Sequence, residues 1–243
     1  MLLEEIEITG IVLNSIRHGE KDRLIKIFSV ELGCITGILK GVDGSNAKLK
    51  FACQSFCFAR FDLVKNGDFY TVKQVDLIDT FFDLTGNYNA YALCSSMLEI
   101  CGVLLKPGII SENLFLCLIK SLKGVVYSQL DEYLVALKFY LDLLNIIGYK
   151  PNFEYCDNCG MKFVGDIKFD YQDGTFRCLN CPGGIKISKK DFMTIKIIYD
   201  TKYEKLYTIK IHSDSIKSAL HLILHNVCNR LNYNIKSFKI DEI

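Results

Sequence analysis

The sequence predicts an α+β protein: a five-stranded barrel of the OB-fold type at the N-terminus, followed by an α-helical domain with an inserted four-cysteine zinc module. Three observations lead to this prediction. Short runs rich in Ile, Val, Phe and Thr recur between turn signals over residues 1–80. Apolar residues of 81–243 recur instead at helical spacing. Four cysteines, arranged as two CxxC pairs, interrupt this second part within 153–185.

The first part is expected to form a small closed barrel. We expect its strands near residues 6–17, 23–30, 34–42, 53–64 and 69–78. Asn66 and Gly67 separate two of the apolar runs, and an Asn-Gly pair favours a type I′ hairpin turn. Glu31 to Gly33 provide another turn signal. Five strands are too few to bury two sheets, so closure into an OB-fold barrel is the favoured architecture.

Three helices are expected to follow the barrel, near residues 84–107, 112–127 and 130–147. The first ends at Pro107, and Ser111 is a suitable N-cap for the second. The third stops at Gly148, with Pro151 beyond it, which is a common end signal. We expect their apolar stripes to pack together as a bundle.

Two more helices are predicted after the cysteines. Ser188 to Asp191 matches an N-terminal capping pattern in front of the segment FMTIKIIYD. A further helix is expected near 214–231, where His221 and His225 lie four residues apart. With no acidic or cysteine companion nearby in the sequence, we interpret these two as ordinary histidines.

The four paired cysteines predict a metal site. Each CxxC places two sulfurs on one tight turn, and eighteen residues separate Cys159 from Cys178. This spacing is typical of tetrahedral zinc. The predicted ligands are Cys156, Cys159, Cys178 and Cys181. Four thiolates leave no coordination position open for water, so the zinc ion is expected to be structural.

Other uses of four cysteines fit less well. Disulfides need an oxidising compartment, and the acidic start MLLEEIEITG lacks the features of a signal peptide. A thioredoxin-like site needs a CxxC that opens a helix after a strand, and iron–sulfur clusters use other spacings. The seven remaining cysteines lie in apolar surroundings, which favours buried thiols in a reducing cytoplasm. Charges interrupt the apolar segments, so no membrane span is expected.

Charge distribution suggests where a nucleic acid would bind. The net charge is only +1, but residues 156–212 carry 10 basic and 7 acidic side chains. OB-fold barrels bind single strands with a basic groove and stacked aromatic rings. The candidate contacts to such a strand are Arg17, Lys21, Arg23, Lys40, Lys48 and Lys50 in the barrel. Lys186, Lys189 and Lys190 cluster beside the cysteines at the start of an expected helix, where the helix dipole does not favour cations, so we expect a functional reason for them. The barrel aromatics Phe51, Phe58, Phe61 and Tyr70 are interpreted as core side chains rather than stacking platforms.

Enzymatic motifs are not found in the sequence. There is no GxxxxGK[ST] phosphate loop and no GxGxxG after an expected strand. His18 and Glu20 form an HxE, which in zinc deaminases precedes a PCxxC. Here the first CxxC follows Tyr155 rather than proline, and four cysteine ligands would leave no position on the zinc ion for the catalytic water. A non-enzymatic protein is therefore expected. The alternatives are a zinc-ribbon transcription accessory protein that binds RNA polymerase, and a metal-dependent hydrolase or deaminase.

Several segments, in the right order, resemble the RecO family of bacterial recombination mediators. GIVLNSIRHGEKDRLIKIFSVELG is similar to the first strands of the family, and Lys40 and Gly41 to the start of its basic loop. ALKFYLDLLNIIGYKPNFEYCDNCG resembles the helix that runs into its first zinc knuckle, and Ile235 to Phe238 its terminal KS motif. One departure is the loop GVDGSNAKLK, which contains Asp43 and only two lysines, whereas the loop of the family is richer in Arg and Lys. Part of the DNA-binding surface is therefore expected to come from Lys186, Lys189 and Lys190.

The resemblance implies the same domain order, with an OB-fold in 1–80 and a helical domain in 81–243. It further implies binding of single- and double-stranded DNA, annealing of complementary strands, and a location in the bacterial cytoplasm. The implied partners are RecR and the single-stranded DNA-binding protein, with which the family helps to load the RecA recombinase.

Overall fold

The computed structural model describes residues 5–44 and 47–240, which form two compact units. The first unit comprises the described residues of Met1–Asp83 together with Leu98–Leu116. The second comprises Leu84–Met97 and the described residues from Cys117 onward. Each unit has its own apolar core.

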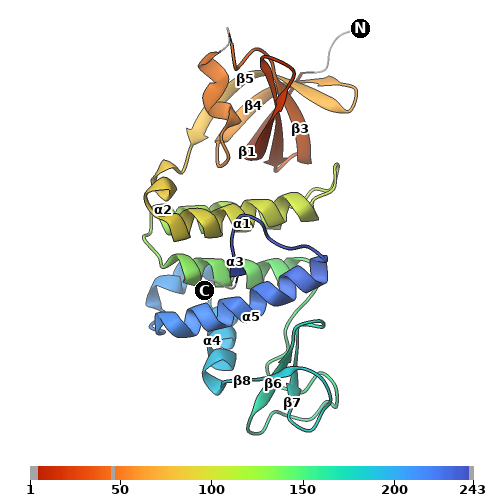
Figure 1. Ribbon diagram of the computed structural model, residues 1–243, viewed down its shortest axis with the longest axis vertical. Helices are drawn as coiled ribbons and strands as arrows, with labels where there is room; N and C mark the ends of the chain where they lie inside the picture. Colours follow the sequence, from red (N-terminus) through yellow and green to blue (C-terminus); the bar gives the residue numbers. More distant parts are fainter. Residues whose placement is uncertain (1–4, 45–46, 241–243) are drawn as a thin grey trace. The chain divides into compact units, whose positions relative to one another are not determined.

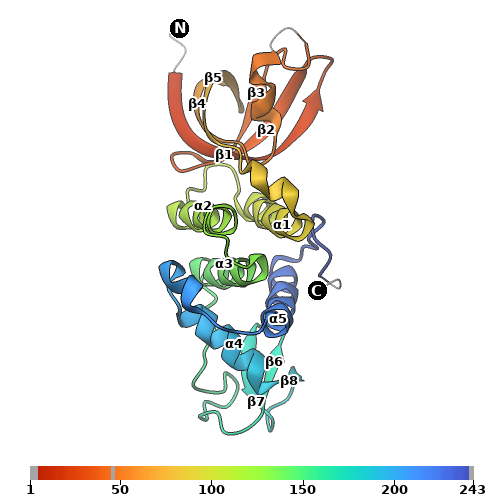
Figure 2. The ribbon, with the colours of Figure 1, turned by 90° about the vertical axis from the view of Figure 1, so that its left-hand side faces the viewer.

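The first unit is built on the predicted closed barrel (Figures 1 and 2). Its strands are β1 (Glu5–His18), β2 (Asp22–Ser29), β3 (Gly33–Leu39), β4 (Phe58–Asn66) and β5 (Phe69–Asp79), in the spatial order β1-β2-β3-β5-β4. β1 pairs with β4 along its first half and with β2 along its second, and the register shifts between Val12 and Asn14. The core inside the barrel includes Ile8, Ile25, Ile27, Phe61 and Leu63. The predicted five-stranded barrel is therefore confirmed.

The β4–β5 hairpin forms as predicted, but its turn differs. Asn66 pairs with Phe69, so the two loop residues are Gly67 and Asp68. Gly67 has a φ of 63°, while Asp68 does not have a positive φ. A type I′ turn needs positive φ at both loop residues, and a glycine at the first alone is typical of type II′. The prediction of a type I′ turn at Asn66 and Gly67 is therefore wrong.

The fourth strand begins later than predicted. Ala47–Cys53 form a 3-10 helix, η1, and β4 begins only at Phe58. Leu49, Phe51 and Cys53 on η1 are partly buried against the barrel core. A short apolar run can bury its side chains as a helix or as a strand, so periodicity alone could not decide between them.

Residues after the barrel pack against it within the first unit. The end of helix α1 (Tyr88–Leu104) presents the carbonyl of Gly102, which accepts a hydrogen bond of 2.6 Å from the Lys26 ammonium. The beginning of helix α2 (Glu112–Val126) places Phe115 edge-on to Phe28, at 5.2 Å between ring centroids. Pro107, between these helices, forms a bridge to Gly33 at the start of β3.

The second unit is helical. Helix α3 (Glu132–Ile146) packs against α4 (Lys189–Asp200) and α5 (Ser213–Leu231). Two further 3-10 helices are η2 (Phe82–Gly86), which precedes α1, and η3 (Tyr203–Thr208), which precedes α5. The predicted end of α3 is confirmed, because Gly148 follows the helix with a φ of 91°. The predicted cap of α4 is also confirmed, because the Ser188 hydroxyl accepts a 3.0 Å hydrogen bond from the Asp191 N–H.

A small sheet in the second unit was not predicted. Strands β6 (Ile167–Asp170), β7 (Thr175–Cys178) and β8 (Ile185–Ile187) form a three-stranded antiparallel sheet in the order β7-β6-β8. Its central side chains, Phe169 and Phe176, are almost fully buried. Strands of three or four residues are too short to show a reliable alternation in the sequence. Over the described part of the chain, no helix has the length and apolar character needed to cross a membrane.

Candidate metal centre and nucleic-acid surface

The first CxxC forms a tight hairpin knuckle. Tyr155 and Lys162 pair across it as an antiparallel bridge. The N–H of Cys156 donates to the carbonyl of Met161 at 2.8 Å, and the N–H of Gly160 donates back to the carbonyl of Cys156, also at 2.8 Å. Gly160 has a φ of 71°, which glycine adopts without strain. The turn therefore directs the side chains of Cys156 and Cys159 to the same place.

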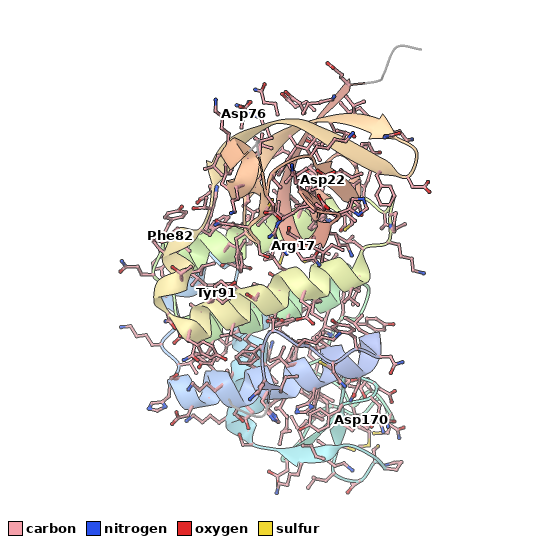
Figure 3. All side chains as sticks on the ribbon, turned by 45° about the horizontal axis from the view of Figure 1, so that its top comes forward. Arg17, Asp22, Asp76, Phe82, Tyr91 and Asp170 are labelled. Atoms are coloured by element: carbon pink, nitrogen blue, oxygen red, sulfur yellow. The ribbon has the colours of Figure 1, made fainter. Side chains whose placement is uncertain are left out.

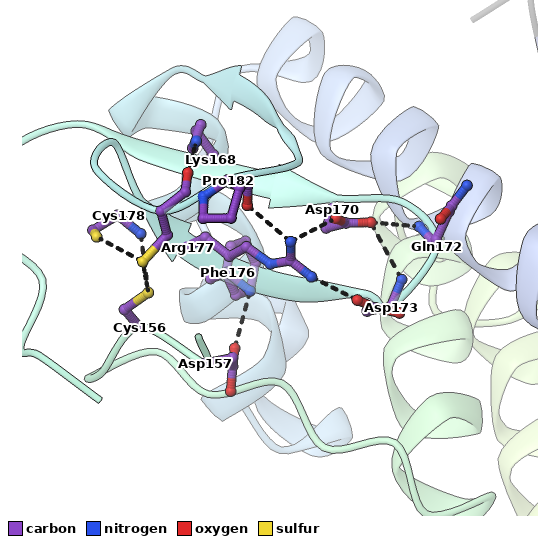
Figure 4. Close-up of polar contacts among 11 residues, drawn as sticks. Cys156, Asp157, Lys168, Asp170, Gln172, Asp173, Phe176, Arg177, Cys178 and Pro182 are labelled. Atoms are coloured by element: carbon purple, nitrogen blue, oxygen red, sulfur yellow. Dashed lines mark hydrogen bonds and ion pairs between the residues drawn. The ribbon is translucent and has the colours of Figure 1, made fainter. Parts of the chain in front are cut away.

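The second CxxC continues from a strand. Cys178 is the last residue of β7, and the N–H of Cys181 donates to its carbonyl at 3.2 Å. The Lys168 ammonium donates a hydrogen bond to the carbonyl of Cys181 (Figure 4). Gly183 and Gly184, both with positive φ, then return the chain toward β8. Strands β6 and β7 thus fix the second pair of cysteines opposite the first.

The four sulfur atoms have the spacing that a tetrahedral metal ion requires. The Sγ–Sγ distances are 3.6 Å from Cys156 to Cys181, 3.8 Å from Cys159 to Cys178 and 3.5 Å from Cys178 to Cys181. All four atoms lie within 4.8 Å of one another. A regular tetrahedron with metal–sulfur bonds of ~2.3 Å has edges of about 3.8 Å. The cluster can therefore hold one metal ion with all four thiolates.

The charges of these sulfurs also favour a cation. Burial raises the pKa of Cys156, but hydrogen bonds from the backbone of Cys178, Cys159 and Asn158 outweigh it and lower that pKa to about 6. One of these is the 3.3 Å bond from the Cys178 N–H to the Cys156 sulfur. Asn158 lowers the pKa of Cys181, but burial and the three neighbouring thiols raise it to about 12. A bound cation would offset the repulsion among four neighbouring thiolates.

Arg177 holds the second knuckle to the neighbouring hairpin (Figure 4). Its guanidinium donates to the carbonyl of Pro182 at 2.9 Å and pairs with Asp170 at 3.1 Å. It also contacts the carboxylate of Asp173 at 2.5 Å. Because the Arg177 side chain is only 15% exposed, these contacts are partly shielded from water. The loop after Cys181 is thereby fixed by charged hydrogen bonds as well as by the cysteines.

The two predicted arginines of the first unit lie side by side. Arg17 and Arg23 are directly opposite each other on β1 and β2. Asp43 lies against both, at 3.1 Å from the Arg23 Nε and 3.8 Å from the Arg17 Nε. Asp22, labelled with Arg17 in Figure 3, accepts a 2.7 Å hydrogen bond from the Gly41 N–H and so holds the loop that carries Asp43.

The remaining predicted lysines of the barrel are all exposed. Lys21 and Lys40 are exposed, and the carbonyl of Lys21 accepts a 3.0 Å hydrogen bond from the Asp43 N–H. Lys48 and Lys50 are exposed on η1. Lys50 lies within electrostatic reach of the Cys53 thiol: burial raises the pKa of Cys53, while the charges of Arg23 and Lys50 lower it. We call these six predicted residues, Arg17, Lys21, Arg23, Lys40, Lys48 and Lys50, the barrel basic group.

The three lysines beside the cysteines differ in their surroundings. All are exposed. Lys186 forms an ion pair with Asp166. Lys189 and Lys190 are the first two residues of α4, and neither forms an ion pair within the described residues. We call Lys186, Lys189 and Lys190 the module basic group. It belongs to the second compact unit, whereas the barrel basic group belongs to the first.

The aromatic side chains of the barrel are core residues, as interpreted from the sequence. Phe58 and Phe61 are buried. Phe51 and Tyr70 are partly buried and pack against the same core. His221 and His225 contact each other, with 3.2 Å between their Nε2 atoms. Within the part of the chain that the structure describes, the four cysteines are the one cluster of three or more metal-binding side chains.

Sequence reasoning missed the residues that support the site. Arg177 and Lys168 make hydrogen bonds around the second knuckle, but neither belongs to a motif. Asp43 was recognised only as a departure from a basic loop, and its position between two arginines was not foreseen. These roles depend on contacts between segments that are distant in the sequence, for which one sequence carries no signal.

The fold and site define a class: proteins with an N-terminal OB-fold barrel and a helical unit that bears a four-cysteine cluster able to hold a metal ion. Two family models match this chain, Recombination protein O N terminal over residues 1–81 and Recombination protein O C terminal over residues 86–237. The chain therefore belongs to the recombination protein O family.

Curated relatives agree with this assignment. A protein of Clostridium novyi is 28% identical, over 88% of this chain and 84% of its own length. One from Acetivibrio thermocellus is 26% identical, over 88% and 87%. Another, from Alkaliphilus metalliredigens, is 25% identical, over 94% and 96%. Each is described as DNA repair protein RecO.

Proposed function

We propose that this chain is a non-enzymatic DNA-binding protein of repair and recombination that acts in the bacterial cytoplasm. Membership of the recombination protein O family carries this proposal. Exposed basic side chains on an OB-fold barrel support it, because such barrels bind nucleic acids through basic surfaces. In functional terms, residues 1–80 would be the nucleic-acid-binding domain and 81–243 a second domain that contains the cysteine module, 153–185.

The proposed metal is one structural Zn²⁺ ion. Cys156, Cys159, Cys178 and Cys181 would bind it, and the sulfur spacing fits a tetrahedral thiolate site. Iron could also be held by four thiolates, but paired CxxC knuckles of this kind are typical of zinc. When bound, the ion would supply the positive charge that lets all four cysteines ionise. The proposed role is to fix the module and the lysines around it.

The barrel and module basic groups would bind DNA by neutralising phosphates, on single and double strands. Arg17 and Arg23 share Asp43, so part of their charge is already compensated. Lys186 is likewise paired with Asp166. The exposed Lys48 and Lys50, together with Lys189 and Lys190, are therefore expected to contribute most per residue. Each phosphate neutralised on a single strand contributes about 0.7 to the slope of log affinity against log salt concentration.

Strand annealing follows from the same chemistry. Two coated strands repel each other less because their phosphates are neutralised, and base pairing then supplies the specificity. The proposed partners are RecR and the single-stranded DNA-binding protein, with which the chain would help to load RecA on covered DNA.

The test is a salt series of single-stranded DNA affinities, measured by fluorescence anisotropy. Lys48→Ala combined with Lys50→Ala should reduce the slope by about 1.4, because two phosphate contacts are lost. A matched control is Lys65→Ala combined with Lys73→Ala, which removes the same charge from β4 and β5. An unchanged slope for the first double variant would remove these lysines from the DNA site. Absence of DNA binding by the wild-type protein at low salt would reject the proposed function.

A further inference from the structure

A groove of about 570 Å³ lies beside the metal centre in the second unit. It runs between the cysteine module and the first turns of α4. Its apolar lining includes Phe153, Phe163, Phe192 and Met193, and its charged lining includes Lys162, Lys189, Lys196, Glu154 and Asp166. We call it the aromatic groove. No sequence motif pointed to it.

The floor of the aromatic groove is a fixed aromatic platform. Phe192 is buried and meets both Phe153 and Phe163 edge-on, each at 5.8 Å between ring centroids. Beneath them, the fully buried Phe176 lies 5.0 Å from Phe192 and 5.3 Å from Phe153. Phe153 and Phe163 are half-buried. The Lys196 ammonium lies 5.5 Å from the centroid of the Phe153 ring, so Phe163 is the ring to which the stacking role is assigned. Rings held in this way can stack on a planar ligand with little loss of side-chain entropy.

The rim carries an excess of uncompensated positive charge. Lys196 pairs with Asp200 at 2.6 Å, and Asp166 pairs with Lys186. Among the described residues, Lys162, Lys189 and Lys190 form no ion pair, and Glu154 is the one lining carboxylate without one. Lys189 and Lys190 also begin a helix, where the helix dipole disfavours cations. The unpaired lysines at the start of α4 are therefore suited to bind an anionic ligand.

We propose that the aromatic groove holds an unpaired base of single-stranded DNA, while Lys162 and Lys189 contact the flanking phosphates. This inference rests on the proposed function and assigns it a strand-selective subsite. Any base can stack on an aromatic ring, but only an unpaired base has a free face to offer. The exposed ring surface distinguishes this ligand from an acidic peptide, which would need the lysines alone.

The test compares full-length, metal-loaded variants on an oligo-dT strand and on a duplex of equal length. Phe163→Leu keeps an apolar side chain of similar size but removes the ring. It should weaken single-strand binding by about fivefold or more and leave duplex binding unchanged, because stacking on an aromatic side chain contributes on the order of 1–3 kcal/mol per base. A 2-aminopurine base in the strand should change its fluorescence when the wild-type protein binds, and this change should be absent with Phe163→Leu. Tyr207→Leu is the matched control, since it removes an exposed aromatic ring that does not line the groove.

A second pair of changes tests the charges and does not depend on the core. Lys162→Gln combined with Lys189→Gln alters only exposed side chains and should lower the ratio of single-strand to duplex affinity. Glu154→Gln should raise single-strand affinity, because it removes the uncompensated carboxylate. If Phe163→Leu reduces metal content or melting temperature, the affinity ratio of the Lys162→Gln and Lys189→Gln double variant becomes the test of the subsite.

Each remaining outcome has one meaning. The proposed subsite would be overturned if a folded Phe163→Leu variant kept the wild-type affinity for single strands, or if the double lysine variant kept the wild-type ratio of single-strand to duplex affinity. In either case, DNA binding by the wild-type protein would still support the proposed function. Groove-dependent capture of poly-glutamate, with DNA affinity unaffected by the groove variants, would show an acidic protein ligand instead. If the wild-type protein bound neither strand nor duplex, the proposed function itself would fail.

Discussion

Replacing Cys156 with serine should release the metal ion and loosen the cysteine module. The Cys156 side chain is almost inaccessible, and its sulfur lies 3.6 Å from that of Cys181. Structural zinc contributes on the order of 10–16 kcal/mol in small zinc-finger peptides, or roughly 2.5–4 kcal/mol for each of four ligands. The loss of one ligand should therefore weaken metal affinity by about a hundredfold or more. The barrel and the helices of the second unit have separate cores and should stay folded.

Two measurements would show this effect. Elemental analysis after dialysis against a mild chelator should find one metal ion per wild-type chain and almost none in Cys156→Ser. Limited proteolysis should cut the variant within 153–185 before it cuts the barrel. Cys53→Ser is the matched control, because Cys53 is a half-buried cysteine outside the cluster. Wild-type metal content and an unchanged digestion pattern in Cys156→Ser would refute the assignment of the four cysteines as ligands.

Three further predictions test other parts of the structure. Gly33→Ala should lower the free energy of unfolding in urea by at least about 2 kcal/mol more than Gly67→Ala does. Both glycines have positive φ, but a Cβ at position 33 would meet a backbone carbonyl oxygen at 2.1 Å, whereas a Cβ at position 67 would meet nothing within 4 Å. Equal losses of stability in the two variants would contradict this prediction. Asp43→Asn should steepen the salt slope of DNA binding by up to about 1.4, because two arginines lose their shared carboxylate and become available to phosphates. A shallower slope in the same titration would contradict this prediction. Lys138→Met should lower the free energy of unfolding by about 2 kcal/mol, measured by heat or urea, because it leaves the partly buried Asp142 without its 2.8 Å ion-pair partner. Adding Asp142→Asn to this variant should recover part of the lost stability. No recovery would show that the two side chains do not stabilise the protein as a pair.

Local signals in the sequence were sufficient for several features. The two CxxC pairs identified a cluster that the fold assembles from a hairpin turn and the end of β7. The Ser188 cap and the glycine after α3 marked helix ends correctly, because each acts within one turn of the chain. Features of this kind depend on residues only a few positions apart, and a single sequence contains all the information they need.

Other features required tertiary contacts. The fourth strand was expected to begin at residue 53 after a polar loop, but Ala47–Cys53 form a 3-10 helix that packs apolar side chains against the barrel, and β4 begins only at Phe58. The aromatic groove combines Phe153 and Phe163 from the cysteine module with Phe192 from α4. Asp43 compensates arginines on β1 and β2 that are about twenty residues or more away along the chain. Such placements follow from packing, and no spacing rule in the sequence encodes them.

DNA binding across a salt series, with strand annealing measured in the same buffers, tests the central claim most directly. If the exposed lysines and arginines of the two basic groups neutralise phosphates, single-strand affinity should fall steeply with salt, with a slope of about −4 for five or six contacts. Annealing of complementary strands should be accelerated and should decline over the same range. Salt-independent affinity, or failure to bind oligonucleotides even in dilute buffer, would contradict the proposal that this chain binds DNA through its basic groups.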